Sequence, residues 1–475
     1  MPESKAPHPD LAEREHSALV VWLLAMASVW HYTSSSNEIW EYWLHFHPVH
    51  TPAVAAICVV GFLAAIYSHL RVAALALSAA GIFVVGLRLP WIPTHLMMEL
   101  FLYLGIAAAW VGLLAQTRSV DRALDGYWER YAPLGRWLLI LMYFYGTFHK
   151  INPVFLSPET SCAVPFIKGV PIVSALADTH WMQLLAIYGT LIVEAAAMCM
   201  LLVPRLKYYG MLMGISFHAA IGISSFGTLA HFSAFALALH AFFLPSSAPR
   251  RFLEDQALPA WMKTRGCRQV ATILIVMPPF AFALLGNWHL TNAHFGLAAL
   301  AFMLFVFRYG RPGESSPAIR LVSPSFAVNV LAVAFVVNGA APYIGLRTTG
   351  AVQMFSGLRT EGGVSNHYVI REPVYLFPYQ RKTISVVDSS DWLLGYLDKH
   401  DLGTPWLNFQ RYLTDPEQSV TLPFTILVNG ERVHVQNARD LRSVFSENYI
   451  EENILEKLYL SFRHFELGEP KGCRH

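Results

Sequence analysis

The residues best suited to chemistry lie at the end of an aromatic, apolar stretch, YFYGTFHKINPVF (residues 143–155). This stretch contains Tyr145 and Phe148 and ends in His149, Lys150 and Asn152. An apolar pocket disfavours the ammonium form of a lysine, so a lysine in such a pocket can act as a base near neutral pH. The stretch therefore predicts a base, Lys150, in an aromatic pocket at the edge of a membrane. The structural alternative is a terminal lysine whose amine extends into the lipid headgroups.

Four more polar residues fall in other apolar stretches, where ionisable groups are costly and are functional candidates by default. His95 and Glu99 are four residues apart and share one helix face, and His218 and His231 lie in two later stretches. We expect them to converge with Lys150 at one depth, around a cavity that opens to the outer leaflet. The structural alternatives are an ion pair between Glu99 and His95 or Arg88, and a hydrogen bond from His218 to a neighbouring helix.

The sequence contains no HExxH or CxxC motif. A metal site built from His149, His218 and His231 would require three separate elements to converge. We therefore expect no metal.

The remaining histidines and cysteines suggest no further site. The five cysteines imply no disulfide framework, although a bridge between Cys162 and Cys473 is geometrically possible outside the cytoplasm. We expect a wet surface for four histidines near the outer end of the first apolar stretch: His31, His45, His47 and His50.

The elements that must position these residues are membrane helices. Hydrophobic residues make up 55% of the 475 residues and charged residues only 14%. The net charge of +2 gives no indication of a nucleic-acid partner. Apolar stretches of about 18–22 residues are long enough to cross a hydrocarbon core. About eleven spans are predicted, at residues 17–34, 51–68, 71–89, 95–116, 134–151, 181–203, 207–226, 228–245, 269–286, 292–308 and 322–342.

The loops between these spans predict the orientation, because lysine and arginine resist translocation. One set of alternate loops is rich in both, whereas the other holds only Arg88, Lys150 and Lys168 before the C-terminal tail. The rich set is therefore cytoplasmic. The expected organisation is a cytoplasmic N-terminal tail (1–16), a membrane domain (17–342) and an extracytoplasmic domain (343–475).

The C-terminal residues predict a small α+β domain. The sequence FTILVNGERVHVQ has the pattern of two strands joined by a tight turn at Asn429-Gly430. Helical stretches are expected from about 438 to 463, with Asp440 or a nearby polar residue as a cap. The predicted fold class is thus an all-α polytopic membrane bundle with a small α+β extracytoplasmic domain.

The order of these pieces resembles the vitamin K-dependent gamma-carboxylases and their bacterial relatives, the HTTM-domain membrane proteins. The resemblance covers about residues 17–370, and its most specific part is the stretch that contains Lys150. Four segments carry it: YFYGTFHKINPVF, GISFHAAIGISSFGTLAHFSAFAL, APYIGLRTTG and MFSGLRTEGGVSNHYVI, the last at residues 354–370.

The resemblance implies an enzyme of a bacterial inner membrane. In that family, a lysine at the position of Lys150 deprotonates vitamin K hydroquinone, which reacts with O2 to form an alkoxide and then the epoxide. The alkoxide can remove a γ-proton from a glutamate, whose carbanion captures CO2. The implied catalytic residues are Lys150, His218 and His95, and the residues expected to bind the substrate are His149, Glu99, Tyr145, Phe148 and His231.

The same resemblance implies further partners and one open role. Besides the lipid bilayer, the expected partners are a membrane-soluble quinol and a peptide or protein that contains glutamate; no nucleic acid is expected. In the segment 354–370, Arg359, Glu361 and His367 are expected to form either a lid over the outer cavity or a docking surface for the outer domain.

Two other classes of function remain open. A transporter or lipid-binding protein could use the same polar layer to bind a headgroup, although no internal repeat, a common feature of transporters, is apparent. A non-catalytic member of the family is also consistent with the sequence, because fold does not fix function.

Overall fold

The structure is a computed structural model that describes residues 11–34, 47–171, 173–226, 229–311, 319–415, 420–428, 430–470 and 472–473. Most of the predicted N-terminal tail, His45 and Asn429 lie outside the described residues. The chain forms two compact units. The first unit contains Met1–Leu87, His95–Phe144 and Val164–Phe335, and the second contains Arg88–Thr94, Tyr145–Ala163 and Val336–His475.

Every predicted span is occupied by a helix, as expected from the length and apolar composition of these stretches. The helices that correspond to the predicted spans are α1 (Leu11–Ser34), α3 (His50–Ile66), α4 (Ala73–Leu87), α5 (Thr94–Thr117), α6 (Val120–Phe148), α9 (His180–Leu202), α10 (Lys207–Ile223), α11 (Ala230–His240), α13 (Arg265–Leu284), α14 (Trp288–Tyr309) and α15 (Phe326–Ile344). The short helices α7 (Pro153–Leu156), α8 (Ala163–Lys168) and α12 (Ala248–Glu254) lie between them.

The number of spans differs from the prediction of eleven. Among the described helices, six are long and apolar enough to cross a membrane: α1, α5, α9, α13, α14 and α15. A seventh is added if Ala230–Phe243 and α12, which are bent by 89°, count as one broken span. Two other apolar helices, α3 and α4, are shorter, with 17 and 15 residues. These six helices indicate a membrane protein.

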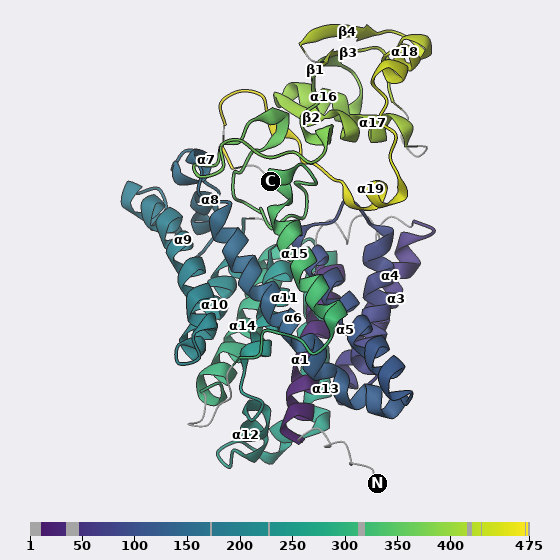
Figure 1. The fold of residues 1–475 in the computed structure, drawn as a ribbon. Helices are drawn as coiled ribbons and strands as arrows, with labels where there is room; N and C mark the ends of the chain where they lie inside the picture. Colours follow the sequence, from purple (N-terminus) through teal and green to yellow (C-terminus); the bar gives the residue numbers. More distant parts are fainter. Residues whose placement is uncertain are drawn as a thin grey trace. The chain divides into compact units, whose positions relative to one another are not determined.

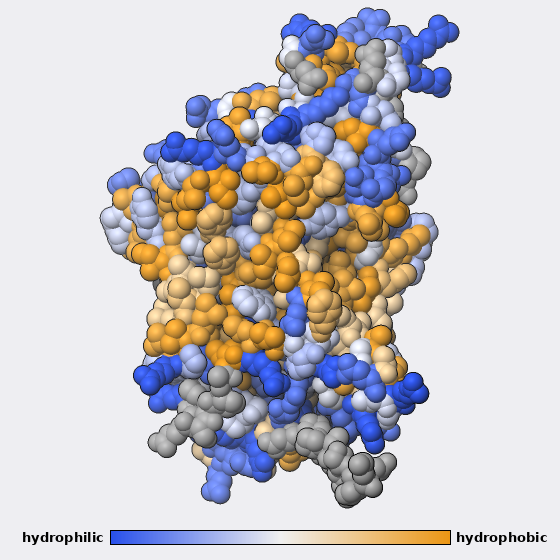
Figure 2. Space-filling view, viewed as in Figure 1, coloured by the Kyte–Doolittle hydropathy of each residue, from blue (hydrophilic) through white to orange (hydrophobic). Residues whose placement is uncertain are grey.

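The helices of the first unit run side by side (Figure 1). Helix α1 packs against α3, α11 and α13, and α10 packs against α9, α11 and α14. Large apolar side chains also point outward, including Ile192 on α9 and Leu297 on α14, which are 66% and 67% exposed. Hydrophobic side chains cover the flanks of these helices, and hydrophilic ones gather at the end that carries α12 (Figure 2). Such an exposed apolar surface suits contact with lipid rather than water.

The second unit contains a five-stranded antiparallel sheet with the strand order β4-β3-β1-β2-β5. Its apolar core includes Trp406, Ile426 and Val435, none of which is exposed to solvent. The elements are β1 (Thr383–Ser389), α16 (Trp392–Lys399), β2 (Leu402–Pro405), α17 (Trp406–Thr414), β3 (Phe424–Val428), β4 (Glu431–Val435), α18 (Ala438–Asn448), α19 (Ile454–Tyr459) and β5 (Phe465–Glu466).

The predicted hairpin is confirmed as β3 and β4, in which Val428 pairs with Glu431. Gly430 has a φ of +86°, the left-handed conformation that a tight turn requires of its glycine. The predicted helical stretch forms α18 and α19. The cap of α18 is Asn437, and Asp440 completes the capping box by bonding back to the Asn437 N–H.

One covalent link in the second unit was not expected. Cys162 and Cys473 form a disulfide across a sequence separation of 311 residues. The sequence could not predict it, because neither cysteine belongs to a spacing motif and the two meet only in the folded unit. The other three cysteines, Cys58, Cys199 and Cys267, are not part of this disulfide.

Candidate functional site

Lys150 lies in a turn that directly follows α6. Its backbone N–H donates to the Thr147 carbonyl at 3.1 Å, so the last turn of the helix tightens before it ends. Asn152 then caps α7 by accepting a hydrogen bond from the Phe155 N–H at 3.0 Å. An asparagine cap followed by proline at the first helical position is a strong start for a helix. The residues after Lys150 therefore fix the direction of the chain at this turn.

The side chain of Lys150 is buried. The residue is only 6% exposed, and its Nζ lies 5.6 Å from the centroid of the Phe155 ring. An ammonium group at this distance from an aromatic ring gains a cation–π attraction. Lys150 thus lies beside an aromatic ring and away from water, in surroundings of the kind that the sequence predicted for it. Its role as a base stays a prediction.

A loop from the C-terminal part of the chain holds this turn in place. We call residues 352–368 the docking segment, because they bond to the chain on both sides of Lys150. Three hydrogen bonds join them: His149 Nδ1 with the Val352 carbonyl (3.1 Å), Asn152 Nδ2 to the Ser356 carbonyl (2.8 Å) and the Tyr368 N–H to the Ile151 carbonyl (3.0 Å).

His367 of the docking segment bonds directly to the end of α6. Its Nε2 donates to the Phe148 carbonyl at 2.8 Å, while its Nδ1 accepts from the N–H groups of Val369 and Ile370 at 3.2 and 3.1 Å. These partners are satisfied only by the neutral ring with its proton on Nε2. Burial lowers the pKa of His367 below its usual 6.5, although the bond to the Phe148 carbonyl opposes this shift.

Aromatic rings surround the other predicted substrate-binding residues of this unit. The His149 ring lies 5.3 Å from that of Tyr145 and 5.5 Å from that of Tyr343, and Phe148 lies 4.5 Å from His367. His149 is fully buried, and its Nε2 has no hydrogen-bond partner among the described residues. A buried nitrogen that lacks a partner is costly, so His149 is a candidate to bind a polar group of a ligand.

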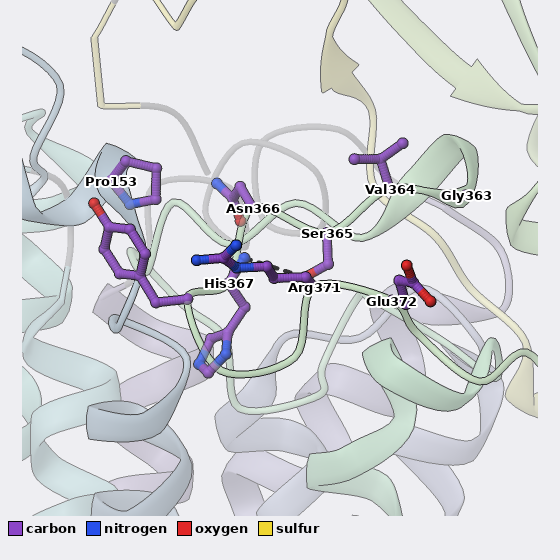
Figure 3. A pocket seen from close by; sticks show the side chains of 9 residues that line it. Pro153, Gly363, Val364, Ser365, Asn366, His367, Arg371 and Glu372 are labelled. Carbon is purple, nitrogen blue, oxygen red and sulfur yellow. Dashed lines mark hydrogen bonds between the residues drawn. The ribbon is translucent and has the colours of Figure 1, made fainter.

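An open hollow of about 510 Å³ lies beside α7 (Figure 3). Pro153 lines one side, and residues 363–368 with Arg371 and Glu372 line the rest. Figure 3 shows His367 at the base of this hollow, with its ring directed toward the helices. The hollow thus contains a cationic side chain, Arg371, and an anionic one, Glu372, both of which follow the docking segment by a few residues.

Arg359 and Glu361 lie inside the second unit rather than over an opening. The guanidinium of Arg359 lies 4.8 Å from the centroid of the Phe465 ring. Glu361 is 1% exposed, and its Oε2 accepts a hydrogen bond from the Thr360 N–H at 3.0 Å. Burial lowers the pKa of the neighbouring Arg463, and the Glu361 carboxylate acts against that shift. These contacts lie within the second unit, and the choice between a lid and a docking surface stays a prediction.

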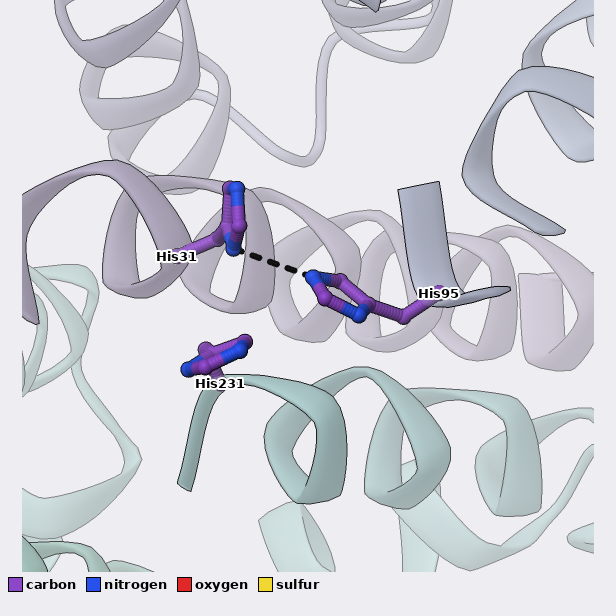
Figure 4. A group of neighbouring side chains, drawn as sticks. All are labelled: His31, His95 and His231. Atoms are coloured by element: carbon purple, nitrogen blue, oxygen red, sulfur yellow. Dashed lines mark hydrogen bonds between the residues drawn. The ribbon is translucent and has the colours of Figure 1, made fainter. Parts of the chain in front are cut away.

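Two of the predicted polar residues of the first unit, His95 on α5 and His231 on α11, lie together with His31 of α1. The ring of His95 lies 4.8 Å from those of both His31 and His231, and its Nε2 is 3.1 Å from His31 Nδ1. Figure 4 shows the three imidazoles converging from three helices. We call these three residues the histidine triad.

A carboxylate lies one helical turn from the histidine triad. Glu99 follows His95 by four residues on α5 and is 1% exposed. Its Oε2 accepts hydrogen bonds from the hydroxyls of Ser28 and Tyr103, at 3.5 and 3.4 Å, and these two hydroxyls are themselves 2.5 Å apart. The polar contacts between α1 and α5 therefore continue for another turn below the histidines.

His218 extends this layer through an aromatic ring. Phe232 lies 6.3 Å from His95 and 5.5 Å from His218, measured between ring centroids. His218 is in turn 5.7 Å from Tyr143, whose hydroxyl forms a 3.1 Å hydrogen bond with His240. His95, Glu99, His218 and His231 therefore belong to one polar layer of the first unit, whereas their expected convergence with Lys150 around an outer cavity stays a prediction.

The prediction of a wet surface is wrong for His31. Helix α1 continues to Ser34, so His31 lies in its last turn, 3% exposed, and faces α5 and α11. Ser28 and His31 are three residues apart and share a helix face, as do His95 and Glu99. This repeated spacing was the signal that could have identified His31.

No family model, curated protein or solved structure matches this chain. The resemblance to the vitamin K-dependent gamma-carboxylases therefore stays a prediction that rests on the four sequence segments.

Proposed function

We propose that this protein is an integral membrane enzyme that oxygenates a reduced naphthoquinone of the vitamin K type. Lys150 is the base that removes a proton from one hydroxyl of the hydroquinone. The resulting anion reacts with O2, and the overall reaction converts hydroquinone and O2 to epoxide and water. Carboxylation of a glutamate in a peptide or protein, with CO2 as the second co-substrate, is a coupled step in this proposal.

The observation that carries the proposal is the buried position of Lys150. A base must come within hydrogen-bond reach of the proton that it removes, and a quinol dissolved in a bilayer arrives through apolar surroundings. Lys150 is 6% exposed and lies next to Phe155, so its amine is better placed to contact a quinol in apolar surroundings than to contact a lipid headgroup in water. In this proposal His149 binds the quinol oxygen, and its buried ring nitrogen and the neighbouring tyrosines Tyr145 and Tyr343 support this role. His218 and His95 complete the proposed catalytic set, and Glu99, Tyr145, Phe148 and His231 the proposed substrate-binding set.

We also propose a topology for this enzyme in a bacterial inner membrane. All eleven predicted stretches cross the bilayer or enter it, with the N-terminus in the cytoplasm and residues 343–475 outside. The disulfide between Cys162 and Cys473 supports this orientation, because structural disulfides persist mainly in oxidising compartments.

The direct test supplies purified protein with chemically reduced vitamin K and O2 and measures the epoxide. Wild-type protein should form the epoxide, and Lys150→Ala should form none while it remains folded. Lys168→Ala is the matched control, because Lys168 is an exposed lysine whose side chain pairs with Asp178. Labelled bicarbonate with a glutamate-containing peptide then distinguishes carboxylation from epoxidation alone.

Two results would contradict the proposal. Wild-type protein that forms no epoxide from any naphthoquinol is not this enzyme. Equal epoxide formation by wild type and Lys150→Ala removes Lys150 from the mechanism.

A further inference from the structure

We propose that the histidine triad, His31, His95 and His231, binds a divalent first-row transition-metal ion. Three helices supply the ligands: His31 from the last turn of α1, and His95 and His231 from the first turns of α5 and α11. The three ligand nitrogens lie within 4.8 Å of one another. This site replaces the metal-free expectation drawn from the sequence, and it does not depend on the proposed reaction of Lys150.

The distances are close to those of a metal site. In a tetrahedral zinc site with Zn–N bonds of about 2.0–2.1 Å, the ligand nitrogens lie about 3.3 Å apart. His95 Nε2 and His31 Nδ1 are already 3.1 Å apart. The largest separation in the triad is at most 4.8 Å, so rotation of the rings must close a gap of at most about 1.5 Å. Side-chain rotation alone can provide this shift.

The donor set defines the class of ion. Imidazole nitrogens suit zinc, iron, copper and nickel, whereas calcium and magnesium prefer oxygen ligands. The site lies in the helical unit, where an uncompensated double positive charge is costly. Glu99, which is 1% exposed and one turn along α5 from His95, can supply negative charge to offset it.

The number of protein ligands points to an open coordination position. Structural zinc sites have four protein ligands, whereas catalytic sites have three and leave one position for water or substrate. His31 and His95 are each 3% exposed, whereas His231 is only partly buried. His231 is therefore the least buried of the three ligands.

The alternative for the same three residues is a cluster of neutral histidines held by hydrogen bonds. His31 and His95 satisfy part of this description, because one ring can donate its proton to the other at 3.1 Å. The two descriptions differ in a measurable way, since only a metal site takes up an ion with fixed stoichiometry.

The test measures metal in the full-length protein, purified in detergent without chelators. Elemental analysis by inductively coupled plasma mass spectrometry should find about one transition-metal ion per chain in wild type. His95→Ala or His31→Ala should lower this metal content at least about tenfold. His218→Ala is the matched control, because it removes a histidine of the same layer that is outside the triad. It should keep the wild-type metal content.

A second measurement covers variants that fail to fold. Wild-type protein stripped with a chelator should bind added Co²⁺ and show the visible absorption bands of a tetrahedral site. Zn²⁺ added afterwards should displace the Co²⁺, and its binding should raise the Tm of the protein. Wild type that binds neither ion stoichiometrically overturns the proposal, as does binding that survives all three triad substitutions. Failure of the epoxide assay with intact metal binding would contradict only the proposed function, so the two outcomes are distinguishable.

Discussion

The position of Lys150 depends on single residues of the docking segment, and Gly357 is the clearest of them. Its φ is +64°, in the left-handed region that favours glycine. A Cβ atom at this position would lie 2.7 Å from Val154 Cγ1, four residues after Lys150. Gly357 therefore allows the docking segment to pass directly over α7.

Gly357→Ala should destabilise the second unit and move the Lys150 turn. The left-handed conformation costs an alanine about 1–2 kcal/mol, and overpacking against Val154 adds about 1–3 kcal/mol. The matched control is Gly363→Ala, because Gly363 has a φ of +86° but nothing within 4 Å of its would-be Cβ. Thermal unfolding in detergent should give the lowest Tm for Gly357→Ala, an intermediate one for Gly363→Ala and the highest for wild type. Equal Tm values for the two variants would show that the contact with Val154 is unimportant.

At the residue scale, the sequence identified candidate residues that stand out from their immediate neighbours in the chain. Lys150 was identifiable because a cation within an aromatic stretch is conspicuous, and His95 and Glu99 because their spacing places them on one helix face. His31 was missed because its partners come from α5 and α11, far away in the sequence. The predicted span 17–34 ends at the same residue as α1, so hydropathy located the end of the helix but not the face on which His31 lies.

At the scale of elements, the docking segment holds the end of α6 through His367. The neutral His367 ring donates one hydrogen bond to α6 and accepts two from its own loop. Protonation of Nδ1 would break the two bonds within the loop. The lowered pKa of His367 in the folded protein agrees with this arrangement.

The sign of the pH dependence follows from this lowered pKa. In the unfolded chain His367 binds a proton near its usual pKa of 6.5, whereas the folded protein binds it only at lower pH. Below pH 6.5 the unfolded state therefore holds more protons, and the free energy of unfolding falls as the pH falls toward the folded pKa. Above that window, His367 contributes no pH dependence.

His367→Gln should remove this part of the acid sensitivity, because glutamine can still donate to the Phe148 carbonyl but does not titrate in this range. Thermal unfolding measured from pH 7.5 to pH 5 should show a smaller loss of Tm for His367→Gln than for wild type. His434→Gln, which changes an exposed histidine of the same unit, is the control and should follow wild type. If His367→Gln also follows wild type, the neutral His367 ring does not stabilise the docked segment.

The helices and the hairpin could be predicted, whereas the docking segment could not. Apolar stretches and the Asn-Gly turn carry periodic or local signals, and each predicted span is a helix in the structure. The docking segment has no regular period. Its hydrogen bonds join residues about 200 positions apart through backbone carbonyl groups, such as the Tyr368 N–H to the Ile151 carbonyl and Asn152 Nδ2 to the Ser356 carbonyl, and carbonyl groups carry no sequence information. The length criterion likewise separates α3 and α4 from the six longer helices, although their composition is similar.

At the scale of the whole molecule, the disulfide bears on the cell compartment that contains Cys162 and Cys473. Cys162 follows α7, and Cys473 belongs to the C-terminal end of the chain, so both lie in the second unit. Cytosolic thiols are kept reduced, so we expect both cysteines to reach an oxidising compartment, as the proposed topology requires.

Counting thiols tests this placement. Wild-type protein denatured with a maleimide and no reductant should label at three of its five cysteines, Cys58, Cys199 and Cys267. Cys162→Ser should label at four, because the loss of Cys162 releases Cys473 as a thiol, whereas the control Cys58→Ser should label at two. In bacterial cells that lack periplasmic disulfide oxidation, wild type should label at all five. Five labelled thiols in ordinary cells would instead place Cys162 and Cys473 in a reducing compartment and reverse the proposed orientation.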